Sequence, residues 1–245
     1  MSSIKSHFLF TAIMSEQHTT HNYAIIVAGG SGTRMQTAIP KQFLLLNGKP
    51  VLMHTIETFY KSASQPQLIL VLHGDYHDYW LQLCQYHHFH IPHQLVKGGE
   101  SRFHSVKNGL DTIADTNAII AIHDAVRPLT LTAIIDHSYN HAAEHGNAIT
   151  AVKSRDSVRQ RKGDHSVSLV REDIYLVQTP QTFRAEQLKK AYEQPYDTKF
   201  TDDASVVENW GIPINLAEGN YNNIKITFPE DIAIAEAILS KKPFA

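Results

Sequence analysis

A glycine-rich turn directly after a short apolar run is the first place in this sequence where residue types and spacing could support chemistry. The run at 23–28 leads into the small residues of 29–34, and the cations Arg34 and Lys41 follow shortly after. Glycines leave room for backbone N–H groups to close on phosphate oxygens. Two neighbouring cations can offset the roughly −4 charge of a nucleoside triphosphate and can reach a pyrophosphate leaving group. The pattern predicts a triphosphate-binding turn.

This turn differs from two common nucleotide-binding motifs. Met35 stands where the dinucleotide fingerprint has its third glycine, and no acidic residue ends the next apolar run at 43–46. The Gly-Lys-Ser/Thr of a Walker A loop is also missing. These departures argue against a nicotinamide dehydrogenase. A plain strand-to-helix turn is the simpler alternative, which the two cations disfavour.

Two further positions carry charges where they could meet this turn. Asp124 and Arg127 follow a predicted strand at 118–122, and Lys225 interrupts the apolar strand predicted at 224–227. A carboxylate at a strand end can bind a sugar hydroxyl or a metal held by phosphates, and Arg127 suits a phosphomonoester. A structural Asp124–Arg127 pair and an exposed strand lysine are the simpler alternatives.

The elements that must position these residues alternate in type along the chain. Apolar runs predict strands at 23–28, 68–72, 93–97, 118–122 and 148–152, and helical spacing predicts helices at 50–62, 75–88, 101–114 and 132–145. Ser101 can cap one of these helices. Repeated strand–helix–strand units need a mostly parallel sheet with helices on both faces. The expected fold is a Rossmann-like α/β domain, which binds ligands at the carboxyl ends of its strands.

The last third of the chain is less regular. The polar segment 154–170 has two β-like runs around Lys162-Gly163-Asp164, which predicts a hairpin. After it we expect helices at 184–192, 205–209 and 231–239, with capping boxes at 205–208 and 227–230. An isolated two-stranded ribbon is marginal, so the hairpin should lean on a second subunit. We therefore predict a flexible extension at 1–21, one domain at 22–245 and a homodimer formed through an arm at about 154–177.

Composition excludes several classes of protein. The 245 residues carry a net charge of −2, and 42% of them are hydrophobic, which excludes a disordered chain and argues against a nucleic-acid binder. No stretch approaches the roughly 18 apolar residues that a membrane span needs. The single cysteine, Cys84, permits no internal disulfide and indicates a cytoplasmic protein. We interpret Cys84 as a core residue. We interpret His137, His141 and His145, spaced four apart, as a solvated helix face rather than a metal site.

Six motifs in order resemble the 2-C-methyl-D-erythritol 4-phosphate cytidylyltransferase family over roughly residues 22–240. They are GSGTRM (30–35) with PKQFL (40–44), GGESRFHSV (98–106) with NGL (108–110), HDAVRP (123–128), TPQ (179–181), TDDAS (201–205), and NIKIT (223–227) with PED (229–231). Family members transfer CMP from CTP to 2-C-methyl-D-erythritol 4-phosphate and release pyrophosphate. The resemblance implies this activity, in isoprenoid precursor biosynthesis, and a divalent cation, Mg²⁺.

The resemblance also implies roles for individual residues. Arg34, Lys41 and Lys225 would be catalytic, stabilising negative charge on the phosphates. The nucleotide would be bound by Ala28, Gly29, Gly30, Ser31, Gly32, Gly98, Gly99, Glu100 and Ser105. The acceptor would be bound by Asp124, Arg127, Ser157, Arg171, Thr179 and Thr201, with Asp124 also a metal ligand. Gly29 and Ser157 depart mildly from the family, which often has Ala and Thr there.

Two other functions share part of this pattern. Ribitol 5-phosphate cytidylyltransferases have the same glycine-rich turn, although TDDAS and PED look more like the erythritol-phosphate enzymes. A module that senses CTP without turnover is a different class. It would not require Arg34, Lys41 and Lys225 together, so the sequence favours an enzyme.

Overall fold

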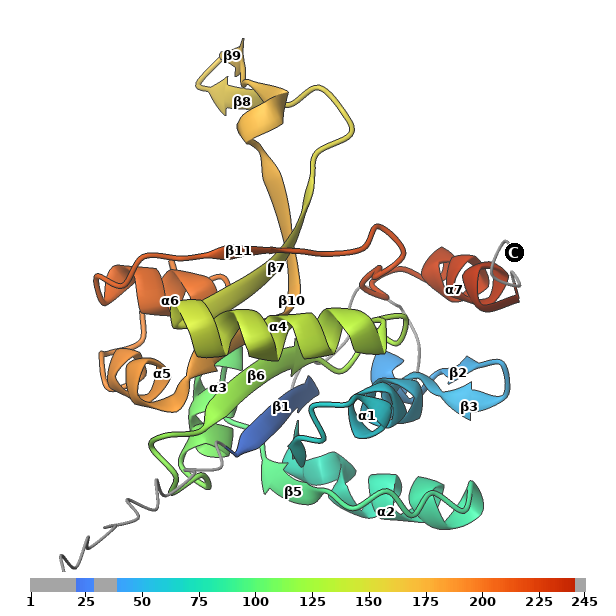
Figure 1. Ribbon diagram of the computed structural model, residues 1–245. Coiled ribbons are helices and arrows are strands. Elements are labelled where there is room, and N and C mark those ends of the chain that lie inside the picture. The colour runs from blue at the N-terminus through green and yellow to red at the C-terminus, as the bar shows by residue number, and fades with distance from the viewer. Residues whose placement is uncertain (1–20, 29–38, 241–245) are drawn as a thin grey trace, which may run out of the picture.

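A seven-stranded sheet forms the centre of the part of the chain that the computed structural model describes, residues 21–28 and 39–240 (Figure 1). Its strands are β1 (Asn22–Ala28), β4 (Gln67–Leu72), β5 (Gln94–Lys97), β6 (Ile119–Asp124), β7 (Asn147–Lys153), β10 (Tyr175–Arg184) and β11 (Leu216–Glu218). They lie in the order β11-β7-β10-β6-β1-β4-β5. β10 pairs antiparallel with β6 and β7, and the other pairs are parallel. The predicted mostly parallel α/β sheet is confirmed.

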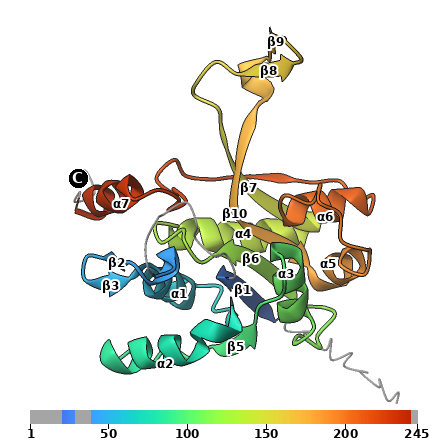
Figure 2. The ribbon, with the colours of Figure 1, turned by 180° about the vertical axis from the view of Figure 1, so that it is seen from behind.

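Helices cover both faces of the sheet (Figures 1 and 2). They are α1 (Val51–Lys61), α2 (His77–Tyr86), α3 (Arg102–Leu110), α4 (Thr132–His145), α5 (Ala185–Ala191), α6 (Asp203–Asn209) and α7 (Glu230–Ser240), with short 3₁₀ turns η2 (Lys41–Phe43), η3 (Gly74–Tyr76) and η4 (Arg171–Asp173). Two small ribbons add β2 (Leu45–Leu46) with β3 (Lys49–Pro50), and β8 (Arg159–Lys162) with β9 (His165–Ser168). Within the described ranges, no helix has the length and apolar character to cross a membrane.

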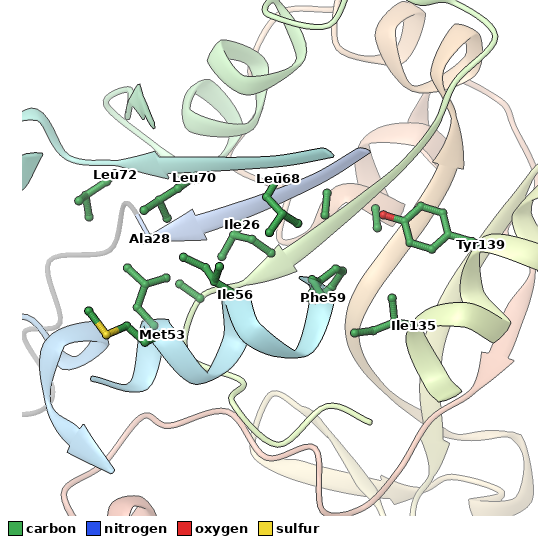
Figure 3. Packing of buried hydrophobic residues seen from close by; sticks show 14 of the residues in the cluster. Ile26, Ala28, Met53, Ile56, Phe59, Leu68, Leu70, Leu72, Ile135 and Tyr139 are labelled. Carbon is green, nitrogen blue, oxygen red and sulfur yellow. The ribbon is translucent and has the colours of Figure 1, made fainter. Parts of the chain in front are cut away.

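Alternation along β1 divides the core between the two faces, because successive side chains of a strand point to opposite sides. Ile26 and Ala28 belong to one buried cluster with Ile56 and Phe59 of α1 (Figure 3). The neighbouring residues of β1 belong to a second cluster, which α3, α5 and α6 complete. β1 is therefore buried on both faces, which explains why its sequence is a continuous apolar run.

The hairpin predicted around Gly163 is present as the ribbon β8–β9, which stands away from the sheet on the extensions of β7 and β10 (Figures 1 and 2). Gly163 has φ of +61°, a conformation that favours glycine. The register pairs Arg159 with Ser168 and Lys162 with His165. The arm therefore begins where β7 leaves the sheet and ends where β10 enters it.

The structure corrects three predictions in the last third of the chain. Residues 224–227 are not a strand, since the backbone of Ile226 bonds only once to the loop after β6, from its N–H to the Val126 carbonyl at 2.9 Å. The predicted capping box at 205–208 is wrong, because the box joins Asp202 and Ser205 and opens α6 at Asp203. At α7 the Asp231 carboxylate, not Glu230, accepts from the backbone N–H groups of Thr227 and Phe228. Strands β10 and β11 had no counterpart in the prediction.

The cap at Asp202 should contribute measurably to stability. Its side chain accepts from the Ser205 N–H at 2.9 Å and from the Gln181 amide at 2.9 Å. Asp202→Ala should lower the free energy of unfolding by about 1–2 kcal/mol, as for other N-cap deletions, and Ser205→Ala by less. Urea denaturation of the two variants checks this order. Equal stability of Asp202→Ala and the parent chain would contradict it.

Candidate active site

The strand order reverses next to β1, and this reversal creates the candidate site. From β1 the chain moves outward through β4 and β5, then returns to place β6 on the other side of β1. Val27 lies beside Asp124 in the β1–β6 register, and the Ala125 N–H donates to the Val27 carbonyl at 3.0 Å. Open α/β sheets bind ligands at such a switch point, outside the carboxyl ends of the strands. In the sequence, the glycine-rich segment 29–34 directly follows Ala28, the last residue of β1.

Asp124 is the centre of a cluster of charges at this edge. Its Oδ2 lies 2.9 Å from Lys225 Nζ and 3.4 Å from Arg127 Nε, and its Oδ1 lies 3.7 Å from Arg102 Nε. Asp124 is only 8% exposed. Burial raises the pKa of its carboxyl group, but the charges of Arg102, Lys225 and Arg127 outweigh burial and hold that pKa well below its usual range. Asp124 is thus a carboxylate at all ordinary pH values.

Arg102 extends the cluster to a second buried carboxylate. Its guanidinium donates to both oxygens of Asp203, at 2.9 and 2.5 Å, and the Tyr192 hydroxyl donates to Asp203 Oδ1 at 2.6 Å. Burial lowers the pKa of Arg102, whereas the charges of Asp203 and Asp124 raise it. The charges outweigh burial, so the pKa of Arg102 lies above its ordinary value. Neither Arg102 nor Asp203 has a role among the predicted site residues. The signal was present, since both lie inside the GGESRFHSV and TDDAS motifs.

Polar side chains behind Asp124 fix the backbone around it. The Thr179 hydroxyl accepts from the Asp124 N–H at 3.1 Å, so this predicted acceptor residue lies in the cluster. His123 is fully buried, with Nε2 3.3 Å from the Arg127 carbonyl. Burial lowers the pKa of His123 to about 3, and the ring is therefore neutral. Arg127 also donates to the Asn223 carbonyl at 2.7 Å.

The residues predicted to bind the base lie at and just beyond the ends of β4 and β5. The Gly98 N–H donates to the Leu72 carbonyl at 2.8 Å, and the Gly99 N–H donates to Ser105 Oγ at 3.1 Å. A Cβ on Gly99 would come within 2.5 Å of His104 Cβ, so only glycine fits. Ser105 is buried and Glu100 is exposed. Ser101 caps α3, as predicted, by accepting from the His104 N–H.

Lys41 is brought to the same sheet edge by its neighbour. The Gln42 side chain is buried and donates to the carbonyl of Ala28, the last residue of β1, at 3.0 Å. Phe43 packs into the core against Tyr79, with ring centroids 5.1 Å apart. These two anchors place the η2 turn, and with it Lys41, beside the end of β1. The other residues predicted for the phosphates, Gly29, Gly30, Ser31, Gly32 and Arg34, lie outside the described residues, as does most of the predicted extension 1–21.

Three predicted acceptor residues, Thr201, Ser157 and Arg171, are exposed, and the last two belong to the arm. Thr201 is exposed, two residues before Asp203. Ser157 and Arg171 are exposed on the arm, where Arg171 pairs with Glu172 at 3.0 Å. The hairpin register places Val158 opposite Leu169, so Ser157 and Arg171 are one position out of register. In both ribbon views the ribbon β8–β9 stands well away from the sheet (Figures 1 and 2).

Two features interpreted as structural are also visible. Cys84 packs against the core at half burial, which raises the pKa of its thiol to about 11. His137, His141 and His145 follow one another along α4, with ring centroids 5.7 and 4.4 Å apart. No three His, Cys, Asp or Glu side chains gather as a metal-ligand group within the described ranges.

Comparisons with known proteins agree on one family. The family model described as IspD, 2-C-methyl-D-erythritol 4-phosphate cytidylyltransferase, matches residues 22–241. Curated relatives with this name from Bacteroides thetaiotaomicron and Bacteroides fragilis are 48% and 47% identical, over 88% of this chain and 98% of each relative. The solved cytidylyltransferase of Francisella tularensis has a TM-score of 0.74 at 33% identity, covering 89% of this chain and 99% of its own. The 4-diphosphocytidyl-2C-methyl-D-erythritol synthase of Anaerococcus prevotii has a TM-score of 0.78 at 28% identity, covering 91% and 97%.

The buried His123 predicts how stability depends on pH. Its folded-state pKa of about 3 is below the ordinary 6.5, so between these values the unfolded chain takes up a proton that the folded chain excludes. Below pH 6.5 this residue should lower the free energy of unfolding by up to about 1.4 kcal/mol per pH unit. His123→Gln keeps a polar atom near the Arg127 carbonyl and should reduce that slope. Denaturation at pH 7 and pH 5 measures the difference, and identical slopes would contradict it.

Proposed function

Because the chain belongs to the 2-C-methyl-D-erythritol 4-phosphate cytidylyltransferase family, we propose that the sheet edge around Asp124 is its active site. The enzyme transfers CMP from CTP to 2-C-methyl-D-erythritol 4-phosphate and releases pyrophosphate, in isoprenoid precursor biosynthesis. The observation that carries the proposal is the meeting of Lys225 with Asp124, residues 101 positions apart whose side chains lie 2.9 Å apart at the switch point. The cations of this cluster would lie next to a triphosphate bound by the glycine-rich segment.

The reaction needs little from the protein besides position and charge. A phosphate oxygen of the acceptor attacks the α-phosphorus of CTP, and the bond to the bridging oxygen of pyrophosphate breaks. No general base is required, since a phosphate dianion is already a nucleophile near neutral pH. The protein must align the two anions and stabilise the charge that grows on the transferred phosphate and the leaving group.

Lys225 is suited to act on the α-phosphate. Its side chain is 41% exposed, and its ammonium group has three N–H donors, of which Asp124 needs one. The remaining donors can meet a phosphate oxygen without loss of the ion pair. Lys41 and Arg34, the latter outside the described residues, would bind the β- and γ-phosphates and the leaving group. Ala28, Gly29, Gly30, Ser31 and Gly32 would supply the turn around these phosphates.

The base of CTP would lie in the pocket at the ends of β4 and β5. Gly98, Gly99 and Glu100 offer backbone groups that can read a pyrimidine edge, and Ser105 already bonds the Gly99 N–H. Asp124, Arg127, Thr179 and Thr201 would bind the acceptor. In this arrangement the two substrates approach each other across Asp124.

The family uses a divalent metal ion, and we propose Mg²⁺. Asp124 fits this group, because Lys225 and Arg127 lie at Oδ2, whereas Oδ1 is 3.7 Å from Arg102, beyond hydrogen-bond distance. One carboxylate oxygen together with substrate phosphates is a common way to hold Mg²⁺. The bound ion would screen the charge that repels the incoming anion.

The arm supports a homodimer in which each chain completes the other's acceptor site. Val170, Tyr175, Leu176 and Val177 are exposed apolar residues at the arm and its base, and such a patch marks an interaction surface. Ser157 and Arg171 would reach the acceptor phosphate of the second chain. A cytoplasmic location stays a prediction.

Removal of the cations should affect turnover more than stability. Lys41→Ala or Lys225→Ala should lower kcat on the order of 10²-fold, since each side chain stabilises transition-state charge. The assay is pyrophosphate release from CTP with 2-C-methyl-D-erythritol 4-phosphate. Lys61→Ala, an exposed lysine of α1, is the matched control and should keep normal kcat. Near-normal kcat in both folded site variants would refute the proposed roles.

The arm should act across the dimer. Arg171→Ala should raise KM for the polyol phosphate more than KM for CTP, because it removes only an acceptor contact. Mixing Arg171→Ala and Lys41→Ala chains, after verified subunit exchange, should restore one working site in each mixed dimer. Recovery of activity supports contact in trans. A monomeric protein, or no recovery after exchange, would show that the arm serves its own chain.

A further inference from the structure

Asn223 uses every hydrogen-bonding group of its side chain while only 1% exposed. Its Oδ1 accepts from the Thr130 hydroxyl at 2.7 Å. Its Nδ2 donates to the Thr179 carbonyl at 2.9 Å and to Gln178 Oε1 at 3.2 Å. The Thr179 carbonyl can only accept, which fixes the orientation of the amide. A buried amide with this set of partners has one allowed position.

These partners come from separate parts of the fold. Thr130 follows β6 and precedes α4, whereas Gln178 and Thr179 belong to β10. The Asn223 carbonyl also accepts from Arg127 at 2.7 Å, and Gln178 donates to the Asn220 carbonyl at 3.0 Å. Asn223 therefore ties the segment before Lys225 to β10 and to the loop that follows β6, the strand that ends with Asp124.

Besides Asn223, the segment that carries Lys225 is held by apolar packing and by one backbone-to-backbone bond to the loop after β6. Residues 223–227 form no strand, and their backbone contact with the loop after β6 is the bond from the Ile226 N–H to the Val126 carbonyl, 2.9 Å long. Ile226 is fully buried and anchors the far side of Lys225 in an apolar cluster. On the near side Ile224 packs against the same cluster, and Asn223 adds the polar anchor that reaches β10. Lys225 lies between these two anchors, with its ammonium group on Asp124.

We propose that Asn223 is a positioning residue for catalysis, which holds the 220–227 segment so that Lys225 meets the α-phosphate of CTP. The inference rests on the proposed role of Lys225. Asn223 contacts no reacting atom in this account, and its effect passes through the place of the Lys225 ammonium group. A displacement of about 1 Å in a catalytic group can cost on the order of 10²-fold in rate.

Asn223→Asp tests this with almost no change in shape. The carboxylate oxygen that replaces Nδ2 would face two acceptors, the Thr179 carbonyl and Gln178 Oε1, so two bonds are lost. We expect kcat to fall about 10- to 100-fold, with KM for CTP changed by less than about threefold, because Lys225 acts mainly in the transition state. Asn222→Asp, the same change at the neighbouring exposed residue, is the control and should keep normal kcat.

A double variant separates positioning from a general structural effect. If Asn223 acts through Lys225, then Lys225→Ala and Lys225→Ala/Asn223→Asp should have the same kcat within about twofold, since coupled residues are not additive. A further tenfold loss in the double variant would overturn the proposal. Normal kcat in folded Asn223→Asp, alongside an impaired Lys225→Ala, would also overturn it and leave the proposed function intact. Normal kcat in Lys225→Ala would refute both the proposed role of Lys225 and the positioning role of Asn223.

Thr130→Val provides a milder test if Asn223→Asp does not fold. It keeps the shape of the side chain and removes the donor to Asn223 Oδ1. We expect kcat to fall about three- to tenfold, as one bond of the amide is lost and the segment loosens. The loss should vanish in the Lys225→Ala background. Unchanged kcat in folded Thr130→Val, or an equal loss in both backgrounds, would contradict the proposal.

Discussion

The burial of one ionised carboxylate, Asp124, is the constraint on which the rest of the site depends. A buried charge is tolerated only when it is paired and hydrogen-bonded. Asp124 finds its partners in Arg102 at the start of α3, Arg127 in the loop after β6, and Lys225 in the 220s segment. Each of these three side chains must reach the Asp124 carboxylate. The start of α3, the loop after β6 and the 220–227 segment are therefore fixed relative to one another.

The charge balance of this cluster suits an anionic ligand. Arg102, Arg127 and Lys225 face two carboxylates, Asp124 and Asp203, which leaves an excess of positive charge at the edge of the sheet. The neutral state of His123, directly behind Asp124, adds no charge to it. Burial strengthens the field of such a cluster, because the surrounding dielectric is low. A triphosphate at the switch point would therefore meet preorganised cations rather than mobile ones.

Sequence patterns predicted the regular parts of this molecule and missed those that tertiary contacts decide. Helix α4 has the bounds that the sequence predicts, and strands β1, β4, β5, β6 and β7 lie within two residues of theirs, because hydrophobic periodicity reports burial. Strand β10 was missed since Pro180 interrupts it, at the point where its register with β7 shifts. The apolar run at 224–227 looked like a strand, but its burial comes from a side-chain cluster without a strand partner.

The same division holds for the site. Lys41, Asp124, Arg127 and Lys225 could be selected because a charge next to a glycine turn, or inside an apolar run, is unusual. Arg102, Asp203 and Asn223 lie inside the motifs, but the sequence does not show what they pair with, since Arg102 and Asp203 are 101 positions apart and Asn223 bonds to residues 44 and 93 positions away. Only the fold shows that these residues support one another.

Strand β10 runs without a break from the base of the arm to the charge cluster around Asp124. Its first residues, Tyr175, Leu176 and Val177, are exposed at the base of the arm, whereas Gln178 and Thr179 are buried against Asn223 and Asp124. The change occurs within one residue, next to the irregular register with β7. The exposed residue Val177 is therefore only two positions from Thr179, whose hydroxyl accepts from the Asp124 N–H. An assembly built through this arm would therefore pack on the same strand that holds the backbone of Asp124.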